Sequence, residues 1–415
     1  MGADLLVVNI GQLATPLGHS AARGAAMADI AAWEDAAVLV RDGAVEYAGP
    51  ASGLAGLDAS EIPLLDAGGR AVVPGFVDSH THFLFAGFRE DEFAWRAGGL
   101  PYMEIHARGG GIRKSMEATR AAPLDLLLAL GEKRLWTMLS MGITTVEGKS
   151  GYGLDKETEL RQLEAMGILA GRLPVGIVPT YLGPHSTPPE FEGRGSAYLD
   201  YVIAEVLPAV AAQGIAKFCD IFCEKGVFGI EDSRRYLLAA RELGFGLKLH
   251  ADEIQRTGGA ALAAELGAAS ADHLLKADPA DLRRLAEAGV VATCLPLTAF
   301  TLREPYADAR GMVESGCAVA IATDLNPGSC YSQSIPLAFA LAVLYMGLSA
   351  QEALTALTLN GAAALGLADS LGSLEPGKAG DLVVLDAPSI GFLAYNAGMN
   401  QVVATVKGGE VVYRA

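Results

Sequence analysis

Several shortages in this chain exclude whole classes of protein. Basic residues are outnumbered, with 31 Lys and Arg against 48 Asp and Glu, so the formal net charge is −17. That acidity argues against non-specific binding to nucleic acid or to anionic membranes. An anionic substrate would need cationic groups placed locally. We therefore expect a small-molecule partner and neither nucleic acid nor membrane.

Cysteine is also scarce, with five residues in 415. The odd count and scattered positions fit reduced thiols, so we expect a cytoplasmic protein. Cys219 and Cys223 are four residues apart, but no second Cys or His pair lies near enough for a zinc knuckle. We expect Cys219, Cys294 and Cys317 to be small core residues.

Three further features are missing from the sequence. No stretch reaches the length of a membrane span. The N-terminus lacks the basic start, apolar core and cleavage site of a signal peptide. No GxGxxG follows a candidate strand, so a dinucleotide-binding fold has no fingerprint here.

What is present points to a large α/β protein with two domains. Hydrophobic residues make up 51% of the chain, enough for a substantial core. Candidate strands in the middle are 72–78, 143–147, 175–181, 216–222, 245–250, 269–273, 290–295 and 318–323. Helical stretches between them include 123–141, 157–170, 233–243, 258–266 and 279–288. Eight such steps predict a (β/α)8 barrel over 71–369, with a doubly wound open sheet as the alternative.

Both ends of the chain favour β structure. Residues 5–10, 36–41 and 45–48 are strand candidates near the N-terminus, with 18–32 expected as a loop. Residues 381–385, 402–407 and 410–413 are candidates near the C-terminus. Asp42-Gly43 and Gly408-Gly409 are hairpin signals. We expect residues 1–70 and 370–415 to form one small β-sandwich domain.

The most informative stretch is 74–82, an apolar run that ends in His80 and His82. Along a strand, positions i and i+2 share a face, so both imidazoles can grip one metal ion. His185, His250 and His273 lie at or just beyond other strand ends, and Asp324 follows the last strand. In a barrel these ends meet at one mouth.

Imidazoles and one carboxylate suit zinc or ferrous iron with a position left for water. We assign the ligands of one such ion as His80, His82, His250 and Asp324. The water would have its pKa lowered toward neutrality. Residues 218–224 end in no lysine that could bridge two ions, and Glu224 more readily supports the wall of the site, so we expect a single metal.

Three side chains are candidates for proton transfer. Glu253, three residues after His250, can contact the substrate or move a proton. The alternative interpretation is that Glu253 is an acidic residue at the start of a helix. His273 can polarise the attacked carbonyl or steady the hydroxide. Asp324 can take a proton from water and pass it to the leaving nitrogen.

These motifs together resemble the amidohydrolase superfamily, and within it the imidazolonepropionase family of histidine degradation. The resemblance is carried by 74–82, 85–93, 109–112, 149–154 (Lys-Ser-Gly-Tyr-Gly-Leu), 182–185, 250–253 and 324–329. It covers nearly the whole chain. It implies hydrolysis of 4-imidazolone-5-propanoate, a cyclic amide, to N-formimidoyl-L-glutamate, and a homodimer.

The resemblance also implies substrate contacts. It sets Arg89, Tyr152, His185 and Glu253 against the substrate, with Asn326, Gly328 and Ser329 touching substrate or product. A guanidinium at Arg89 can grip a carboxylate side chain in a bidentate fork, although the neighbouring acids offer a surface salt bridge instead.

Two other functions stay open from the residues alone. A His-x-x-Glu pairing also serves deamination of a heteroaromatic ring such as a nucleobase. An inactive barrel acting as an assembly scaffold is the second alternative, although such a chain would be expected to have lost ligands.

Overall fold

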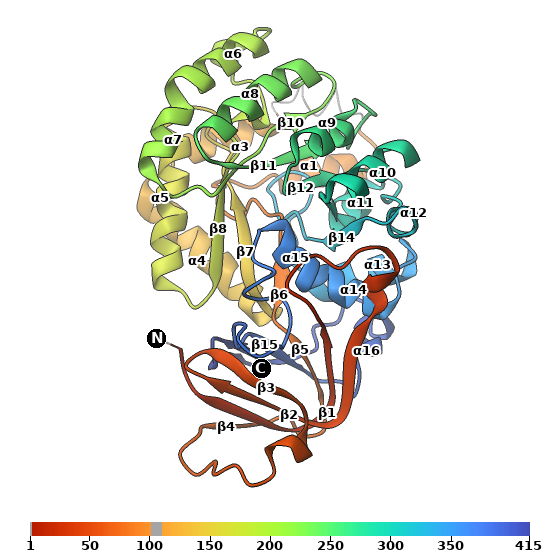
Figure 1. Ribbon diagram of the computed structural model, residues 1–415. Helices are drawn as coiled ribbons and strands as arrows, with labels where there is room; N and C mark the ends of the chain where they lie inside the picture. Colours follow the sequence, from red (N-terminus) through yellow and green to blue (C-terminus); the bar gives the residue numbers. More distant parts are fainter. Residues whose placement is uncertain (1, 101–109) are drawn as a thin grey trace.

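The computed structural model describes residues 2–100 and 110–415, and its centre is a barrel of parallel strands (Figure 1). Gly109, the first residue of the Gly-Gly-Gly motif, lies outside the described residues. Neighbours in the sheet run β14-β13-β12-β11-β9-β8-β7-β6, with β10 (Phe222–Cys223) beside β11. The other bounds are β6 (Phe76–Asp78), β7 (Ile143–Lys149), β8 (Gly176–Tyr181), β9 (Phe218–Cys219), β11 (Gly246–Ala251), β12 (Ser270–His273), β13 (Val291–Cys294) and β14 (Ala318–Ile321). The (β/α)8 barrel is confirmed, and the doubly wound sheet is excluded.

The helices surround this sheet, and the five stretches expected from the sequence are all helical. Their bounds are α4 (Leu124–Ser140), α5 (Lys156–Arg172), α8 (Ile230–Glu242), α9 (Gly259–Leu266) and α10 (Pro279–Ala288). The other described α-helices are α1 (Glu90–Ala97), α3 (Ile112–Ala121), α6 (Gly195–Tyr201), α7 (Leu207–Gln213), α11 (Pro296–Leu302), α12 (Ala309–Glu314), α13 (Ile335–Leu344), α14 (Ala350–Leu357), α15 (Leu359–Ala364) and α16 (Gly391–Tyr395).

Helix α5 shows how local sequence sets these elements. Asp155 caps its start by accepting the Thr158 backbone N–H at 2.7 Å. Leu163, Met166 and Leu169 recur every three residues and are fully buried against the barrel. The helix therefore begins at a cap and is held by one apolar face.

The barrel closes between its first and last strands, just beyond their C-terminal ends. The Asp324 backbone N–H donates to His80 O at 3.0 Å, and the His82 N–H donates to Leu325 O at 2.8 Å. Asp78 accepts from the Thr323 backbone at 2.9 Å and from its hydroxyl at 2.6 Å. This seam brings the histidines of one strand end beside the aspartate of the other.

Both ends of the chain contribute to a second, eight-stranded sheet in the order β17-β16-β15-β5-β1-β2-β3, with β4 beside β1. Its strands are β1 (Leu5–Pro16), β2 (Ile30–Arg41), β3 (Ala44–Pro50), β4 (Leu64–Asp66), β5 (Ala71–Pro74), β15 (Leu382–Leu385), β16 (Val402–Lys407) and β17 (Glu410–Arg414). The expected β-sandwich built from both termini agrees with this sheet. The boundaries at 70/71 and 369/370 stay a prediction.

Two local expectations were wrong. The single strand 72–78 is split at Gly75 into β5 of the terminal sheet and β6 of the barrel. A Cβ at Gly75 would lie 2.3 Å from the Thr144 hydroxyl, so only glycine fits this crossing. The expected loop 18–32 is shorter, because β1 extends to Pro16 and pairs with β2 from Ile30 onward.

Cysteine and membrane expectations can be compared with the described residues. All five cysteines are free and buried, and Cys219, Cys294 and Cys317 belong to the main core, as expected. No helix in the described part of the chain combines the length and the apolar character that a membrane crossing requires.

Candidate metal centre and active site

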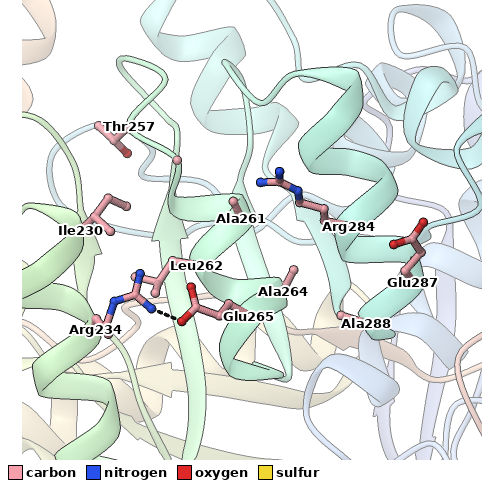
Figure 2. Close-up of a pocket in the computed structure, with 11 residues that line it drawn as sticks. Ile230, Arg234, Thr257, Ala261, Leu262, Ala264, Glu265, Arg284, Glu287 and Ala288 are labelled. Atoms are coloured by element: carbon pink, nitrogen blue, oxygen red, sulfur yellow. Dashed lines mark hydrogen bonds and ion pairs between the residues drawn. The ribbon is translucent and has the colours of Figure 1, made fainter.

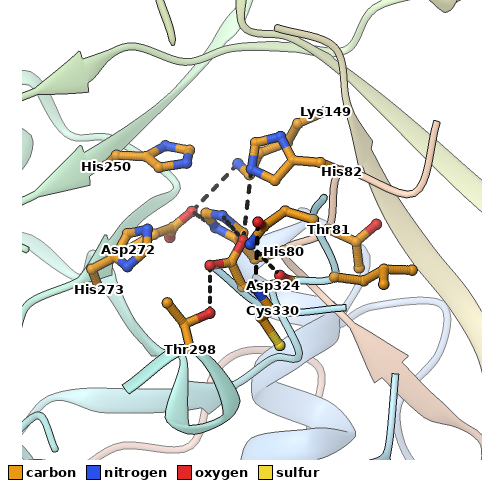
Figure 3. A network of polar contacts seen from close by, with 12 residues as sticks. His80, Thr81, His82, Lys149, His250, Asp272, His273, Thr298, Asp324 and Cys330 are labelled. Carbon is orange, nitrogen blue, oxygen red and sulfur yellow. Dashed lines mark hydrogen bonds and ion pairs between the residues drawn. The ribbon is translucent and has the colours of Figure 1, made fainter. Parts of the chain in front are cut away.

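Three imidazoles and one carboxylate meet at the C-terminal mouth of the barrel (Figure 3). The ring centroid of His80 lies 4.6 Å from that of His250 and 5.5 Å from that of His82. Asp324 Oδ1 lies 3.6 Å from His80 Nε2 and 3.7 Å from His82 Nε2. All four side chains are at most 4% exposed. The structure therefore brings the four sequence-predicted ligands together.

The donor atoms fit a metal ion better than they fit one another. Separations of 3.6 and 3.7 Å exceed a hydrogen bond. Two ligands at ~2.1 Å from one tetrahedral ion are ~3.4 Å apart. Among the described residues, His80 Nε2 and His250 Nε2 are buried without a hydrogen-bond partner. Buried polar atoms are rarely left unpaired, so these nitrogens have the character of metal ligands.

The protonation state of the imidazoles also suits metal binding. Burial lowers the pKa of His80, His82 and His250 well below the ordinary value, so these rings are neutral at pH 7. Neutral imidazole is the form that binds a metal.

Asp324 is held in an unusual backbone conformation. Its φ is 52° and that of His273 is 75°, both in the left-handed region that non-glycine residues rarely adopt. Thr298 Oγ1 donates to Asp324 Oδ2 at 2.7 Å, which leaves Oδ1 facing the imidazoles. Burial raises the pKa of Asp324 to about 7.

Glu253 and His273 lie beside the histidine cluster. The His273 ring centroid is 5.1 Å from that of His250, and its Nδ1 is 3.6 Å from Glu253 Oε1. Burial lowers the pKa of His273 to about 4. Burial, reinforced by the charge of Asp324, raises the pKa of Glu253 to about 8. At pH 7 the site therefore holds a neutral imidazole next to a protonated carboxyl.

The acid at the helix start is Asp252 rather than Glu253. The Asp252 carboxylate accepts four backbone N–H groups of 257–260. Glu224 accepts the N–H groups of Ile254 and Gln255, as expected for a residue that supports the wall. These two carboxylates fix the loop that carries Glu253 and leave its own carboxyl free.

Arg89 forms an ion pair, but a buried one. Its Nε and Nη2 donate to Glu92 at 2.8–3.0 Å, and the two side chains are 13% and 4% exposed. A Cβ built on Gly328 would lie 2.3 Å from Arg89 Nη1, so the third nitrogen faces the loop after β14. A larger residue at position 328 would therefore displace the guanidinium.

Tyr152 and His185 form an aromatic wall against His82. The His185 ring stacks on His82 at 4.9 Å with an interplanar angle of 10°, and Tyr152 meets His82 edge-on at 5.5 Å. His185 Nδ1 lies 3.1 Å from Gly151 O, which leaves Nε2 for other contacts. Burial lowers the pKa of His185 to about 4, so it too is neutral.

Asn326 organises the loop that contains Gly328 and Ser329. Its Oδ1 accepts both of their backbone N–H groups at 2.8 Å, and its Nδ2 donates to Asp324 O at 2.8 Å. This side chain therefore connects the loop facing Arg89 to Asp324 at the candidate metal site.

Sequence reasoning missed the charged groups inside the barrel. They are Glu147, Lys149, Asp220, Lys248 and Asp272, and none of these side chains is exposed. The signal was present, since charged residues interrupt apolar strand runs, with Lys149 two residues after Glu147 and Lys248 two before His250. It also missed Glu159, which accepts the N–H groups of Gly151, Gly153 and Leu154 and so shapes the turn around Tyr152.

A groove of about 720 Å³ lies elsewhere, on the outside of the barrel between α8, α9 and α10 (Figure 2). The Arg234–Glu265 ion pair spans it, and none of the sequence-predicted site residues lines it. It is separate from the histidine cluster.

Comparison with known proteins agrees with this geometry. The Amidohydrolase family model matches residues 237–412. Escherichia coli guanine deaminase superposes with a TM-score of 0.73 at 16% identity and full coverage of both chains. Klebsiella pneumoniae 5-methylcytosine deaminase gives 0.71 at 18%, covering 99% of this chain and 98% of that one. At such identities the likeness shows the fold alone, and the class that fold and site define is an amidohydrolase barrel.

Sequence relatives narrow the class. An imidazolonepropionase of Porphyromonas gingivalis is 54% identical over 412 residues, covering 99% of this chain and 97% of the relative. One of Clostridium tetani is 50% identical over 412 residues, covering 99% and 98%. This chain belongs to the imidazolonepropionase family.

Proposed function

We propose that this enzyme hydrolyses the cyclic amide of 4-imidazolone-5-propanoate to N-formimidoyl-L-glutamate, a step of histidine degradation. The observation that carries the proposal is a single mouth that holds unpartnered imidazole nitrogens and Asp324. The Arg89 guanidinium lies near enough for its charge to act on Tyr152 and His185, which flank His82. The names of the whole-length relatives support the same reaction.

The site would hold one divalent ion, zinc or iron, with four ligands: His80, His82, His250 and Asp324. The fit is supported by neutral rings, orphaned Nε2 atoms and ligand separations near those of a tetrahedron. Such an ion lowers the pKa of bound water toward neutrality and so supplies a nucleophile.

Substrate binding depends on the carboxylate of the propionate side chain. Arg89 binds the propionate through Nη1, because Nε and Nη2 are already paired with Glu92. Tyr152 and His185 pack against the ring. The loop of Asn326, Gly328 and Ser329 borders the substrate or the ring-opened product.

Proton transfer is assigned to three residues. Asp324 accepts a proton from the attacking water and returns it to the leaving nitrogen. His273, neutral at pH 7, donates to the carbonyl oxygen as negative charge develops there. Glu253, protonated below about pH 8, donates to the other ring nitrogen and regains a proton from the carboxylic acid that hydrolysis forms.

The test is turnover by protein of measured metal content. Freshly prepared imidazolone propionate is followed by its absorbance, and the product is identified by mass spectrometry. Arg234→Gln, in the outer groove, is the matched control and should retain activity. Full metal occupancy without turnover, together with ammonia release from a purine or pyrimidine, would replace this proposal with deamination.

We further propose a cytoplasmic homodimer. The buried free cysteines support a reducing compartment. Light scattering of the purified protein measures the subunit number, and a monomeric mass would reject the dimer.

A further inference from the structure

Below the imidazoles lies a dry cluster of two ammonium groups and three carboxylates that the mechanism above does not use. It comprises Glu147, Lys149, Asp220, Lys248 and Asp272, all with fully buried side chains. Unpaired charges in such a place are strongly unfavourable, so the arrangement of partners decides what the cluster does.

Lys149 lies between the two aspartates. Its Nζ donates to Asp220 Oδ2 at 2.7 Å and to Glu147 Oε1 at 3.2 Å, and lies 3.4 Å from Asp272 Oδ2. Figure 3 shows Lys149 behind the imidazoles and joined to Asp272. One ammonium therefore holds carboxylates that come from two different strand regions of the barrel.

The same two oxygen atoms also face the imidazoles. Asp272 Oδ2 is 2.7 Å from His80 Nδ1, and Asp220 Oδ2 is 2.9 Å from His250 Nδ1. A carboxylate at Nδ1 fixes the ring orientation and leaves Nε2 as the lone-pair donor. Both Nε2 atoms lack a hydrogen-bond partner, and so does His250 Nδ1, whose approach to Asp220 Oδ2 is an ion-pair contact without hydrogen-bond geometry.

We propose that Lys149 is a positioning residue, which holds Asp220 and Asp272 so that they aim the Nε2 atoms of His250 and His80 at the metal. The inference rests on the proposed metal site and deepens it. Lys248 differs, because its Nζ donates to Glu147 Oε2 at 2.8 Å and to Ser79 O at 3.1 Å. Lys149, unlike Lys248, contacts both of the aspartate oxygens that face the imidazoles.

The experiment measures zinc affinity by competition with a chromogenic chelator, without substrate. Lys149→Met keeps the volume of the side chain and removes the ammonium. Zinc binding should weaken about 10- to 100-fold, as when other partners of ligand histidines are removed. Lys378→Met is the matched control, since Lys378 is also fully buried but donates to Ala368 O at 2.7 Å, in the segment that leads into the terminal sheet. It should lower the melting temperature while zinc affinity stays within twofold.

Cobalt substitution adds a readout that simple destabilisation would not move. The visible absorption of bound Co²⁺ reports ligand geometry, and its bands should shift or weaken in Lys149→Met and not in Lys378→Met. Unchanged zinc affinity and an unchanged cobalt spectrum in Lys149→Met would overturn the inference. Absence of zinc binding by the wild-type protein would instead overturn the proposed function.

A charge-balanced double variant covers the case in which Lys149→Met does not fold. Lys149→Met with Asp220→Asn removes one charge of each sign. If Lys149 acts through both aspartates, the double variant should bind zinc more weakly than Asp220→Asn alone, because Asp272 has also lost its ammonium partner. A double variant that binds zinc as tightly as Asp220→Asn, or more tightly, would contradict the proposed action of Lys149 through Asp272.

Discussion

Arg89→Ala separates recognition of the substrate carboxylate from the rest of the site. The guanidinium is buried, and two of its nitrogens already pair with Glu92. Removing it therefore has two consequences. The substrate loses its proposed cationic partner. Among the described residues, the Glu92 carboxylate then keeps the hydrogen bond from the Gly111 N–H, at 3.0 Å.

The two consequences have different sizes and different readouts. A hydrogen bond to a charged group contributes about 1.5–3 kcal/mol, which corresponds to about 10- to 150-fold in KM. Leaving the buried Glu92 carboxylate without its cation lowers the free energy of unfolding by about 3–5 kcal/mol before the structure relaxes. Arg89→Ala should therefore bind substrate poorly and also melt earlier. The Arg89→Ala/Glu92→Gln double variant should recover most of the stability and none of the affinity.

The assay compares the propionate substrate with its uncharged propionamide analogue. Wild-type protein should prefer the propionate by about the factor that Arg89→Ala loses on it, about 10- to 150-fold. Arg89→Ala should treat the two alike, with its metal content unchanged. An equal loss on both substrates would refute carboxylate recognition by Arg89, and loss of metal would show that the residue is structural.

Three more outcomes follow from the site. Glu253→Gln should lower kcat by about 10²- to 10⁴-fold. In the wild-type protein kcat/KM should fall above about pH 8, because Glu253 loses its proton there, and this fall should be absent from the variant. A fall retained in Glu253→Gln would show that another group causes it. Asp324→Asn should reduce bound zinc at least tenfold in elemental analysis, and full occupancy would exclude Asp324 as a ligand. Glu159→Gln should loosen the turn around Tyr152 and raise KM several-fold with metal retained, whereas exposed Glu157→Gln on the same helix should match wild type.

Much of the fold could be read from pattern alone. Alternation of apolar strand runs with helices such as α5 depends on spacing along the chain, and local spacing is what a sequence displays. The split at Gly75 could not be predicted, because residues 72–77 form one continuous apolar run and only the different partners of β5 and β6 separate them. The long arms of β1 and β2 were missed for the same reason, since small and polar residues acquire strand geometry there by pairing.

The site divides in a similar way. His80 and His82 could be predicted from their spacing, and Asp324 from its place after the last strand. The partners of the ligands gave a weaker signal. Asp272 meets His80 because the barrel brings β12 and the end of β6 around one axis, and Asp220 meets His250 because β9 pairs with β11.

By itself, the sequence determined the barrel, the terminal sheet and the kinds of donor available at the strand ends, because periodicity and residue chemistry are local properties. Tertiary structure alone decided which nitrogen of His80 is free, which nitrogen of Arg89 is available and which carboxylates surround the buried Lys149. Those depend on distances between segments far apart in the chain, such as those of His80 and Asp272, which are 192 residues apart.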